Sequence, residues 1–141
     1  MAPAEARAGR AAGEGPVGAL VVVGGVIVGQ AQSAPIGLVD PSAHAEVLAL
    51  REAARKLGNY RMPDATLFAT LEPCAMCCGA LIQARLARVV YGAPDLRAGA
   101  IESVYRLLDD PRLNHRVEAQ GGVLADECTA LLREFFETKR R

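Results

Sequence analysis

Short apolar runs alternate with polar and glycine-rich segments along most of the chain, and this pattern predicts the order of its strands and loops. Residues 17–23 and 26–28 are apolar, β-branched runs on either side of Gly24-Gly25, which predicts a hairpin of two buried strands. Residues 30–40 hold serine, proline, glycine and aspartate, so we expect a loop there. Further strands are expected at residues 66–71, 88–91 and 117–120.

Helical periodicity occupies the stretches between the later strands. The first helix is expected to begin near Ser42, capped by Asp40 or Ser42, and to end at Gly58-Asn59. Steps of four and three residues predict one apolar face for this helix, formed by Ala43, Val47, Leu50, Ala54 and Leu57. Three more helices are expected: one opened by Pro73, a short one near residues 103–108, and an amphipathic one at residues 125–138.

The order of these elements predicts an α/β protein with a mixed sheet of about five strands. Helices on both faces of that sheet would make a three-layer α/β/α sandwich. Two strand–helix–strand crossovers occur in the order, and each should join parallel strands. We expect one domain at residues 16–141, preceded by a short segment at residues 1–15 that is either helical or disordered.

Composition narrows the class of protein. The chain has 141 residues, 51% of them hydrophobic and 4% aromatic, so its core must be built from small aliphatic side chains. The formal net charge is zero, which argues against a strongly cationic nucleic-acid binder but leaves RNA binding by one face open. No apolar run reaches the roughly eighteen residues of a membrane span, and no secretory signal is evident. We therefore expect a cytoplasmic protein that does not enter a membrane.

Two short motifs carry the candidate chemistry. His44-Ala45-Glu46 lies at the start of one predicted helix, and Pro73-Cys74-Ala75-Met76-Cys77 opens another. Cys74 and Cys77 are three residues apart and can share one helix face. His44 and Glu46 lie at the start of the first helix, where both side chains can approach one point just beyond its N-terminal end. Histidine and cysteine are ligands of zinc, and three protein ligands leave a fourth position for water, whose pKa falls to roughly 7.

The pair of motifs resembles the signature of zinc-dependent nucleobase deaminases, in which the glutamate is not a ligand but moves protons. Glu46 would take a proton from the attacking water and deliver protons to the ring nitrogen and the departing amine. Cys78 lies four residues after Cys74 and remains an alternative ligand to Cys77, or else a small buried apolar residue. Cys128 is expected in the core.

From residue 16 to residue 141 the chain resembles the bacterial tRNA adenosine deaminases, the TadA family. The resemblance extends beyond the zinc motifs and includes Pro16-Val17-Gly18-Ala19, Asp40-Pro41-Ser42-Ala43-His44-Ala45-Glu46, Thr70-Leu71-Glu72-Pro73-Cys74, Arg88-Val89-Val90-Tyr91-Gly92-Ala93 and Leu113-Asn114-His115. It implies the cytidine deaminase-like fold, one zinc ion per subunit, and hydrolysis of adenosine to inosine at the wobble position of a tRNA anticodon loop. It also implies a homodimer, with residues 80–86 at the contact between subunits.

The resemblance assigns roles to particular residues of this sequence. His44, Cys74 and Cys77 would bind zinc, Glu46 would move protons, and Asp95 would contact the nucleotide beside the target base, unless it only caps its own loop. The remaining residues of the predicted substrate pocket are Val17, Ser33, Ala45, Leu71, Glu72, Pro73, Ala93 and Asn114. Some of them would act through backbone groups, as preorganised dipoles do.

The chain also departs from the family. Ser33 stands where the family usually has an asparagine that bonds the purine edge, and a serine offers a hydroxyl in place of an amide. The segment before Pro16 is shorter than the family's first helix. These departures leave rival substrates open: a free base or nucleotide (guanine, cytosine or cytidine), or adenine in single-stranded DNA. A non-catalytic partner subunit is disfavoured because Glu46 is present, and a thiol redox module would leave His44-Ala45-Glu46 unexplained.

Overall fold

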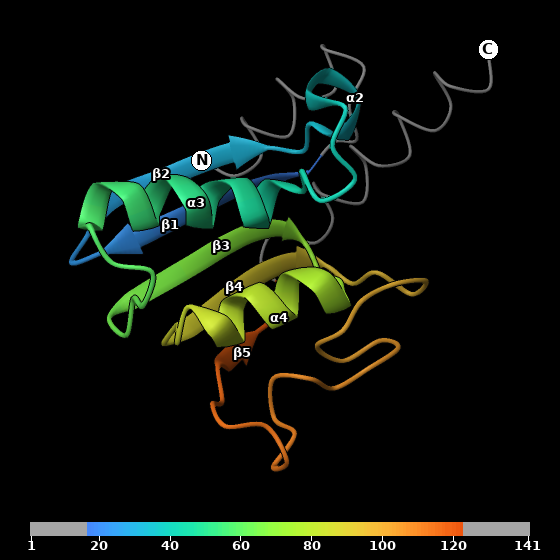
Figure 1. Cartoon of the computed structure of the whole chain (residues 1–141). Helices are drawn as coiled ribbons and strands as arrows, with labels where there is room; N and C mark the ends of the chain where they lie inside the picture. Colours follow the sequence, from blue (N-terminus) through green and yellow to red (C-terminus); the bar gives the residue numbers. More distant parts are fainter. Residues whose placement is uncertain (1–16, 123–141) are drawn as a thin grey trace.

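The computed structural model describes residues 17–122, which form a five-stranded sheet in the order β2-β1-β3-β4-β5 (Figure 1). β1 (Gly18–Val23) pairs antiparallel with both β2 (Val26–Gln32) and β3 (Ala65–Leu71). β4 (Arg88–Ala93) pairs parallel with β3 and with β5 (Glu118–Gln120). The mixed sheet is as predicted, and so are the parallel pairs β3–β4 and β4–β5, although only the first of these pairs is joined by a helix in the described residues.

The predicted hairpin is present, and its turn uses both glycines. Gly24 and Gly25 have φ values of 56° and 78°, a conformation that costs a residue with a side chain more than it costs glycine. β2 continues to Gln32, farther than the prediction, because the ladder with β1 extends to the pair Gly18 and Gln32. The expected loop at residues 30–40 is therefore shorter, and it contains the one-turn helix α2 (Pro35–Leu38).

Helix α3 (Ala45–Leu57) begins three residues later than expected, with His44 as its N-cap. The Asp40 side chain accepts hydrogen bonds from the amide and hydroxyl of Ser42 instead, so it closes the turn before the helix. The C-terminal end is as predicted: Gly58 is the C-cap, with a φ of 69°.

The buried face of α3 differs from the predicted one. Its buried residues are Ala45, Glu46, Ala49, Leu50 and Ala53, whereas Leu57 is 41% exposed. Small side chains on this face let α3 lie very close to β2, where a Cβ at Gly29 would be 2.2 Å from the carbonyl oxygen of Ala49. The sequence periodicity was ambiguous because alanine occurs on both sides of the helix.

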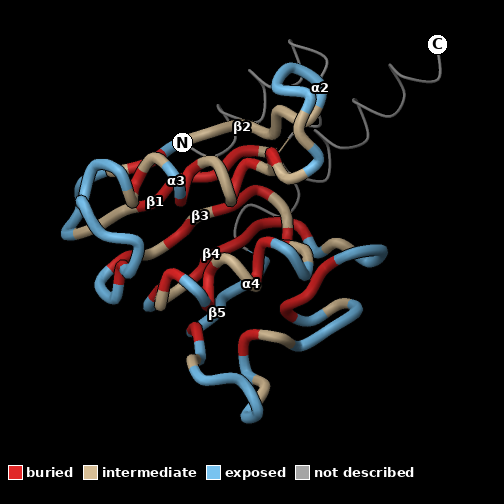
Figure 2. The backbone as a smooth tube through the Cα atoms, viewed as in Figure 1, coloured by how far each residue is buried: buried red, intermediate tan, exposed pale blue. Residues whose placement is uncertain are grey.

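Helix α4 (Ala75–Gln83) connects β3 to β4 and covers the same face of the sheet as α3 (Figure 1). Cys74 is its N-cap, and Leu81 and Ile82 are buried in the core. The core follows β1, β3 and β4 beneath the two helices (Figure 2) and is mainly aliphatic, with Leu67, Leu81, Leu86, Val21 and Val89 among its largest fully buried side chains.

The helix predicted near residues 103–108 is absent from the described part of the chain, where residues 94–117 form turns and loops between β4 and β5. The amides of Ile101, Glu102 and Ser103 donate to the carboxylate of Glu72 rather than to a helix. The predictions for residues 1–15, for the helix at residues 125–138 and for Cys128 lie outside the described residues. Within residues 17–122, no helix has the length and apolar character needed to cross a membrane.

Candidate active site

The starts of α3 and α4 bring the two sequence motifs together. His44 and Cys74 are the N-cap residues of these helices, both with extended backbone, and neither side chain caps its own helix. The two side chains are therefore free to face each other, and the amide-rich first turns of both helices point toward the same place. The partial positive charge at a helix start favours thiolates and other anions there.

Three donor atoms form a small triangle at this point. The Sγ atom of Cys74 is 3.6 Å from Nδ1 of His44 and 3.7 Å from Sγ of Cys77, and Cys77 Sγ is 3.6 Å from the same nitrogen. Side-chain atoms so close together, one from each residue, can hold a metal ion. The sulfur of Cys78 is directed to the carbonyl oxygen of Pro73 at 3.7 Å, so the alternative ligand set with Cys78 is not the one assembled here.

The electrostatics of the three groups are strongly coupled. A hydrogen bond from the Cys77 thiol lowers the pKa of Cys74 to about 3. The same bond, together with burial, raises the pKa of Cys77. Metal ligands of these types bind as thiolates and neutral imidazole, so metal binding at this site would release protons.

Glu46 lies next to this triangle and is nearly inaccessible, with 4% of its surface exposed. Among the described residues, its Oε1 is the buried side-chain oxygen that has no hydrogen-bond partner. Burial raises the pKa of the Glu46 carboxyl above its ordinary value. A carboxyl with one unpaired oxygen and a raised pKa is suited to accepting and releasing protons.

A pocket of about 150 Å³ opens onto the donor triangle. Most of the predicted site residues line it: Val17, Ser33, His44, Glu46, Leu71, Glu72, Cys74 and Asp95. Ala98 is a lining residue that the sequence did not single out, because a lone alanine in a loop carries no motif.

Comparison with known proteins gives this arrangement its context. The model of the MafB19-like deaminase family matches residues 1–140. A tRNA-specific adenosine deaminase of Haemophilus influenzae is 46% identical over 131 residues, which cover 92% of this chain and 76% of the relative. The chain belongs to the tRNA-specific adenosine deaminase family. A second tRNA-specific adenosine deaminase, from Bacillus subtilis, is 40% identical over 137 residues, which cover 97% of this chain and 85% of that relative.

Solved structures support membership of this deaminase family at the level of the fold. A tRNA:A34 deaminase, studied for A-to-I editing at the wobble position of transfer RNA, superposes with a TM-score of 0.91 and 37% identity. The match covers 94% of this chain and 96% of that one. A guanine deaminase from Nitrosomonas europaea has a TM-score of 0.82 at 26% identity and covers 95% of this chain and 80% of that one. The predicted cytidine deaminase-like fold is confirmed.

Four predicted pocket residues of the deaminase do not line the pocket: Ala45, Pro73, Ala93 and Asn114. The first three are buried behind its wall. Asn114 is exposed, and its side-chain oxygen accepts a hydrogen bond from Arg85, which follows the C-terminal end of α4. Since Cys74 caps the opposite end of that helix, Asn114 lies away from the donor triangle of its own chain.

Asp95 lies at the pocket and also caps its loop. Its Oδ1 accepts hydrogen bonds from the amides of Arg97 and Ala98 at 3.1 and 3.2 Å. The loop-capping role is therefore observed, while contact with a substrate nucleotide stays a prediction for a residue that lines the pocket.

Proposed function

We propose that this protein is a zinc-dependent tRNA adenosine deaminase, which hydrolyses adenosine to inosine and ammonia at the wobble position of an anticodon. The observation that carries the proposal is the triangle formed by His44, Cys74 and Cys77 beside the unpaired buried oxygen of Glu46. The family relationship supports the same activity, since the curated relatives carry the name tRNA-specific adenosine deaminase.

The donor set fits zinc in both chemistry and size. Zinc–sulfur bonds of about 2.3 Å and a zinc–nitrogen bond of about 2.05 Å at tetrahedral angles would separate two sulfurs by about 3.8 Å and sulfur from nitrogen by about 3.6 Å. The corresponding separations here are 3.7 Å between the sulfurs and 3.6 Å from each sulfur to Nδ1 of His44. One histidine and two cysteines leave a tetrahedral position for a non-protein ligand, as catalytic zinc sites require.

When bound, zinc supplies a Lewis acid that makes water a nucleophile near neutral pH. The chain's own residues supply the rest of the chemistry. Oε1 of Glu46 would accept one proton from the attacking water and deliver it to the ring nitrogen, and would then accept the proton of the added hydroxyl and deliver it to the leaving amine. Burial of Glu46 keeps this carboxyl away from bulk water, so its proton is exchanged with the substrate rather than with solvent.

The pocket accommodates a base that has left its stack. Its volume of about 150 Å³ is small, which suits one nucleobase rather than a helix. An anticodon loop is single-stranded, so turning a base out costs little, and the edge of that base can be recognised by side chains. Val17, Ser33, Leu71 and Asp95 are the residues that we assign to this contact, with Ala98 added by the structure.

The test is inosine formation in an anticodon stem-loop RNA with an ACG anticodon, using zinc-loaded full-length protein. Wild type should form inosine, and Glu46→Ala should lose turnover by at least about a hundredfold because general acid–base catalysis is removed. Glu46→Ala should still bind one zinc equivalent, since Glu46 is not a ligand. Normal turnover by that variant would refute the proton-transfer role.

A second candidate substrate class, free purine bases, is favoured by one observation. Ser33 occupies the pocket wall where the family usually has an asparagine, and a guanine deaminase shares the fold. The same assay should therefore include free guanine, cytosine and cytidine together with a DNA version of the loop. Inosine formed only in RNA would support tRNA as the substrate. Turnover of a free base or of the DNA would assign that compound as the substrate instead.

We also propose that two copies of the chain associate as a homodimer. An apolar groove of about 350 Å³ lies between α3 and α4 and is lined by Val47, Leu50, Ala54, Met62, Ala80 and Ala84. Three of its lining residues, Ala80, Gln83 and Ala84, fall in the stretch that the family resemblance assigns to the subunit contact. Sedimentation of the full chain should give twice the monomer mass, and a charge introduced by Val47→Lys should reduce it to the monomer.

A further inference from the structure

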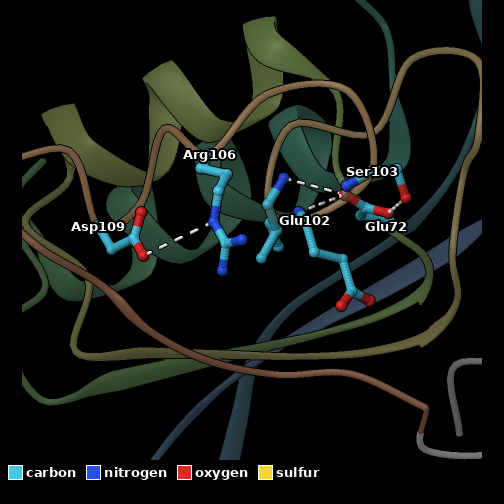
Figure 3. A network of polar contacts seen from close by, with 6 residues as sticks. Glu72, Glu102, Ser103, Arg106 and Asp109 are labelled. Carbon is cyan, nitrogen blue, oxygen red and sulfur yellow. Dashed lines mark hydrogen bonds and ion pairs between the residues drawn. The ribbon is translucent and has the colours of Figure 1, made fainter.

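Glu72 is a buried carboxylate that takes no part in the proposed proton transfer. It follows the last residue of β3 and precedes Pro73-Cys74, and only 2% of its surface is exposed. Its Oε2 accepts hydrogen bonds from the amides of Ile101, Glu102 and Ser103 at 3.0, 2.8 and 3.1 Å. Figure 3 shows the backbone nitrogen of Glu102 directed at this carboxylate, while the Glu102 side chain points away from it.

The other carboxylate oxygen extends the same network to the beginning of the loop. Glu72 Oε1 accepts a hydrogen bond from the amide of Asp95 at 3.1 Å and another from the hydroxyl of Ser103. Five donors thus converge on one side chain, and the four backbone donors come from residues 23 to 31 positions later in the sequence. An ionised carboxylate can accept all of these bonds, whereas a glutamine would place an NH₂ group against backbone N–H donors.

The loop is also joined to the ligand turn itself. Gly99 forms an isolated antiparallel bridge with Cys74, and the amide of Ala100 donates to the carbonyl oxygen of Pro73 at 2.9 Å. Gly99 leaves no space for a side chain, because a Cβ there would be 2.3 Å from the carboxylate carbon of Glu72. The loop therefore packs directly against the carboxylate and against the residue that would hold the metal.

This loop forms one wall of the pocket. Asp95 and Ala98 line the pocket, and both lie inside the segment that Glu72 holds. Glu72 and Cys74 are two residues apart on one rigid turn after β3. The Glu72 side chain and the backbone bonds of Gly99 and Ala100 together therefore hold the pocket wall in place relative to the donor triangle.

We propose that Glu72 is a positioning residue for the substrate, which holds residues 95–103 so that Asp95 and Ala98 keep a fixed place relative to Cys74. The inference rests on the proposed function of the pocket. Glu72 neither touches the reacting atoms nor binds the metal, because its oxygens are occupied by the loop. Its removal should therefore weaken substrate binding more than it slows the chemical step.

The experiment compares Glu72→Gln with wild type and with Asp110→Asn, in zinc-loaded full-length protein. Asp110 is a matched control, since its carboxylate also caps a loop, accepting from the amide of Arg112 at 2.9 Å, but it does not line the pocket. Three quantities are measured: amide hydrogen exchange without RNA, bound zinc, and KM and kcat on the stem-loop RNA.

For Glu72→Gln we expect faster exchange confined to residues 95–103, one zinc equivalent, and a KM raised about tenfold with a smaller change in kcat, as loss of bonds to a charged acceptor implies. Asp110→Asn should leave KM and the exchange of that loop unchanged. Unaltered exchange at residues 95–103 in Glu72→Gln would overturn the proposal. Loss of zinc, or a fall in kcat at constant KM, would also overturn it, because either would place the role of Glu72 at the ligand turn.

Gly99→Ala provides a second route to the same outcome, because its methyl group would displace the carboxylate without changing any charge. It should raise KM in the same direction as Glu72→Gln, and a normal KM with normal loop exchange would count against the proposal. The exchange measurement needs no substrate. It therefore decides on the link between Glu72 and the loop even if wild type forms no inosine, a result that would refute the proposed function instead.

Discussion

Two buried glutamates lie within one site and have opposite electrostatic roles. Burial raises the pKa of Glu46, whose Oε1 has no partner. Burial also opposes ionisation of Glu72, but hydrogen bonds from Glu102 and Ser103 outweigh it and lower the pKa of that carboxyl. The local supply of N–H and O–H donors, rather than burial alone, decides which carboxyl can exchange a proton and which stays charged.

Ser33 lines the pocket at the position where the family resemblance predicts an asparagine. Ser33→Asn should raise kcat/KM for adenosine in the RNA about two- to tenfold, because a longer amide can supply one more hydrogen bond to the purine edge. The measurement is inosine formation at low substrate concentration, with Ser33→Ala as the control that removes the hydroxyl. An unchanged kcat/KM in Ser33→Asn would show that a water or another residue already supplies the bond.

The sequence predicted the reactive residues better than it predicted the pocket around them. His44, Glu46, Cys74 and Cys77 lie in two compact motifs at helix starts, so their spacing alone indicates a common target. The position of Asn114 depends on where a loop meets the far end of α4, which no local pattern reports. The use of Glu72 as a loop support was equally invisible, because its partners begin 23 residues away.

At the scale of elements, the close contact between α3 and β2 is sensitive to the size of the side chain at position 29. Gly29→Ala should destabilise the protein by about 1–3 kcal/mol, because its Cβ would be 2.2 Å from a backbone oxygen that cannot move without the helix. Urea unfolding measures the change. The control is Gly79→Ala in α4, where a Cβ has open space, and it should stabilise by about 0.5–1 kcal/mol through helix propensity. Equal effects of the two substitutions would contradict the packing argument.

Most elements were predictable because each has a local signal, and the two failures have separate causes. Strands β1, β3 and β4 are continuous apolar runs, and the Gly24-Gly25 turn and the Gly58 cap follow from backbone preference. The helix expected near residues 103–108 is replaced by wider turns, in which the amides of Val104 and Tyr105 both donate to the carbonyl oxygen of Gly99. The start of α3 was misplaced because His44, not the nearby Asp40 or Ser42, occupies the cap position.

At the scale of the whole molecule, the donor triangle connects two helices that are separated by a strand. His44 belongs to the start of α3 and Cys74 to the start of α4, with β3 between them in the sequence. A metal bound only by the folded state should stabilise it by about 2.7 kcal/mol at a hundredfold excess over Kd.

Removal of the metal with a chelator should therefore lower Tm by on the order of 10 °C, measured by calorimetry, and added zinc should restore it. His44→Ala provides the control, because a protein that lacks one ligand should respond far less to chelator or zinc. A wild-type Tm that is the same with and without chelator would contradict a metal held by these three residues.

The support of residues 95–103 by Glu72 has a consequence for how this enzyme can diversify. Ile101 and Glu102 contact the carboxylate through main-chain amides, so these contacts do not depend on the identity of their side chains. In a library of random variants, both positions should reject proline, which lacks an N–H group. The exposed position 102 should accept many other residue types, whereas position 101 should accept only apolar ones because Ile101 is buried in the core. Gly99 should accept almost none. The loop can thus drift in sequence, and with it the surface offered to different nucleic acids, while its course past the pocket stays the same.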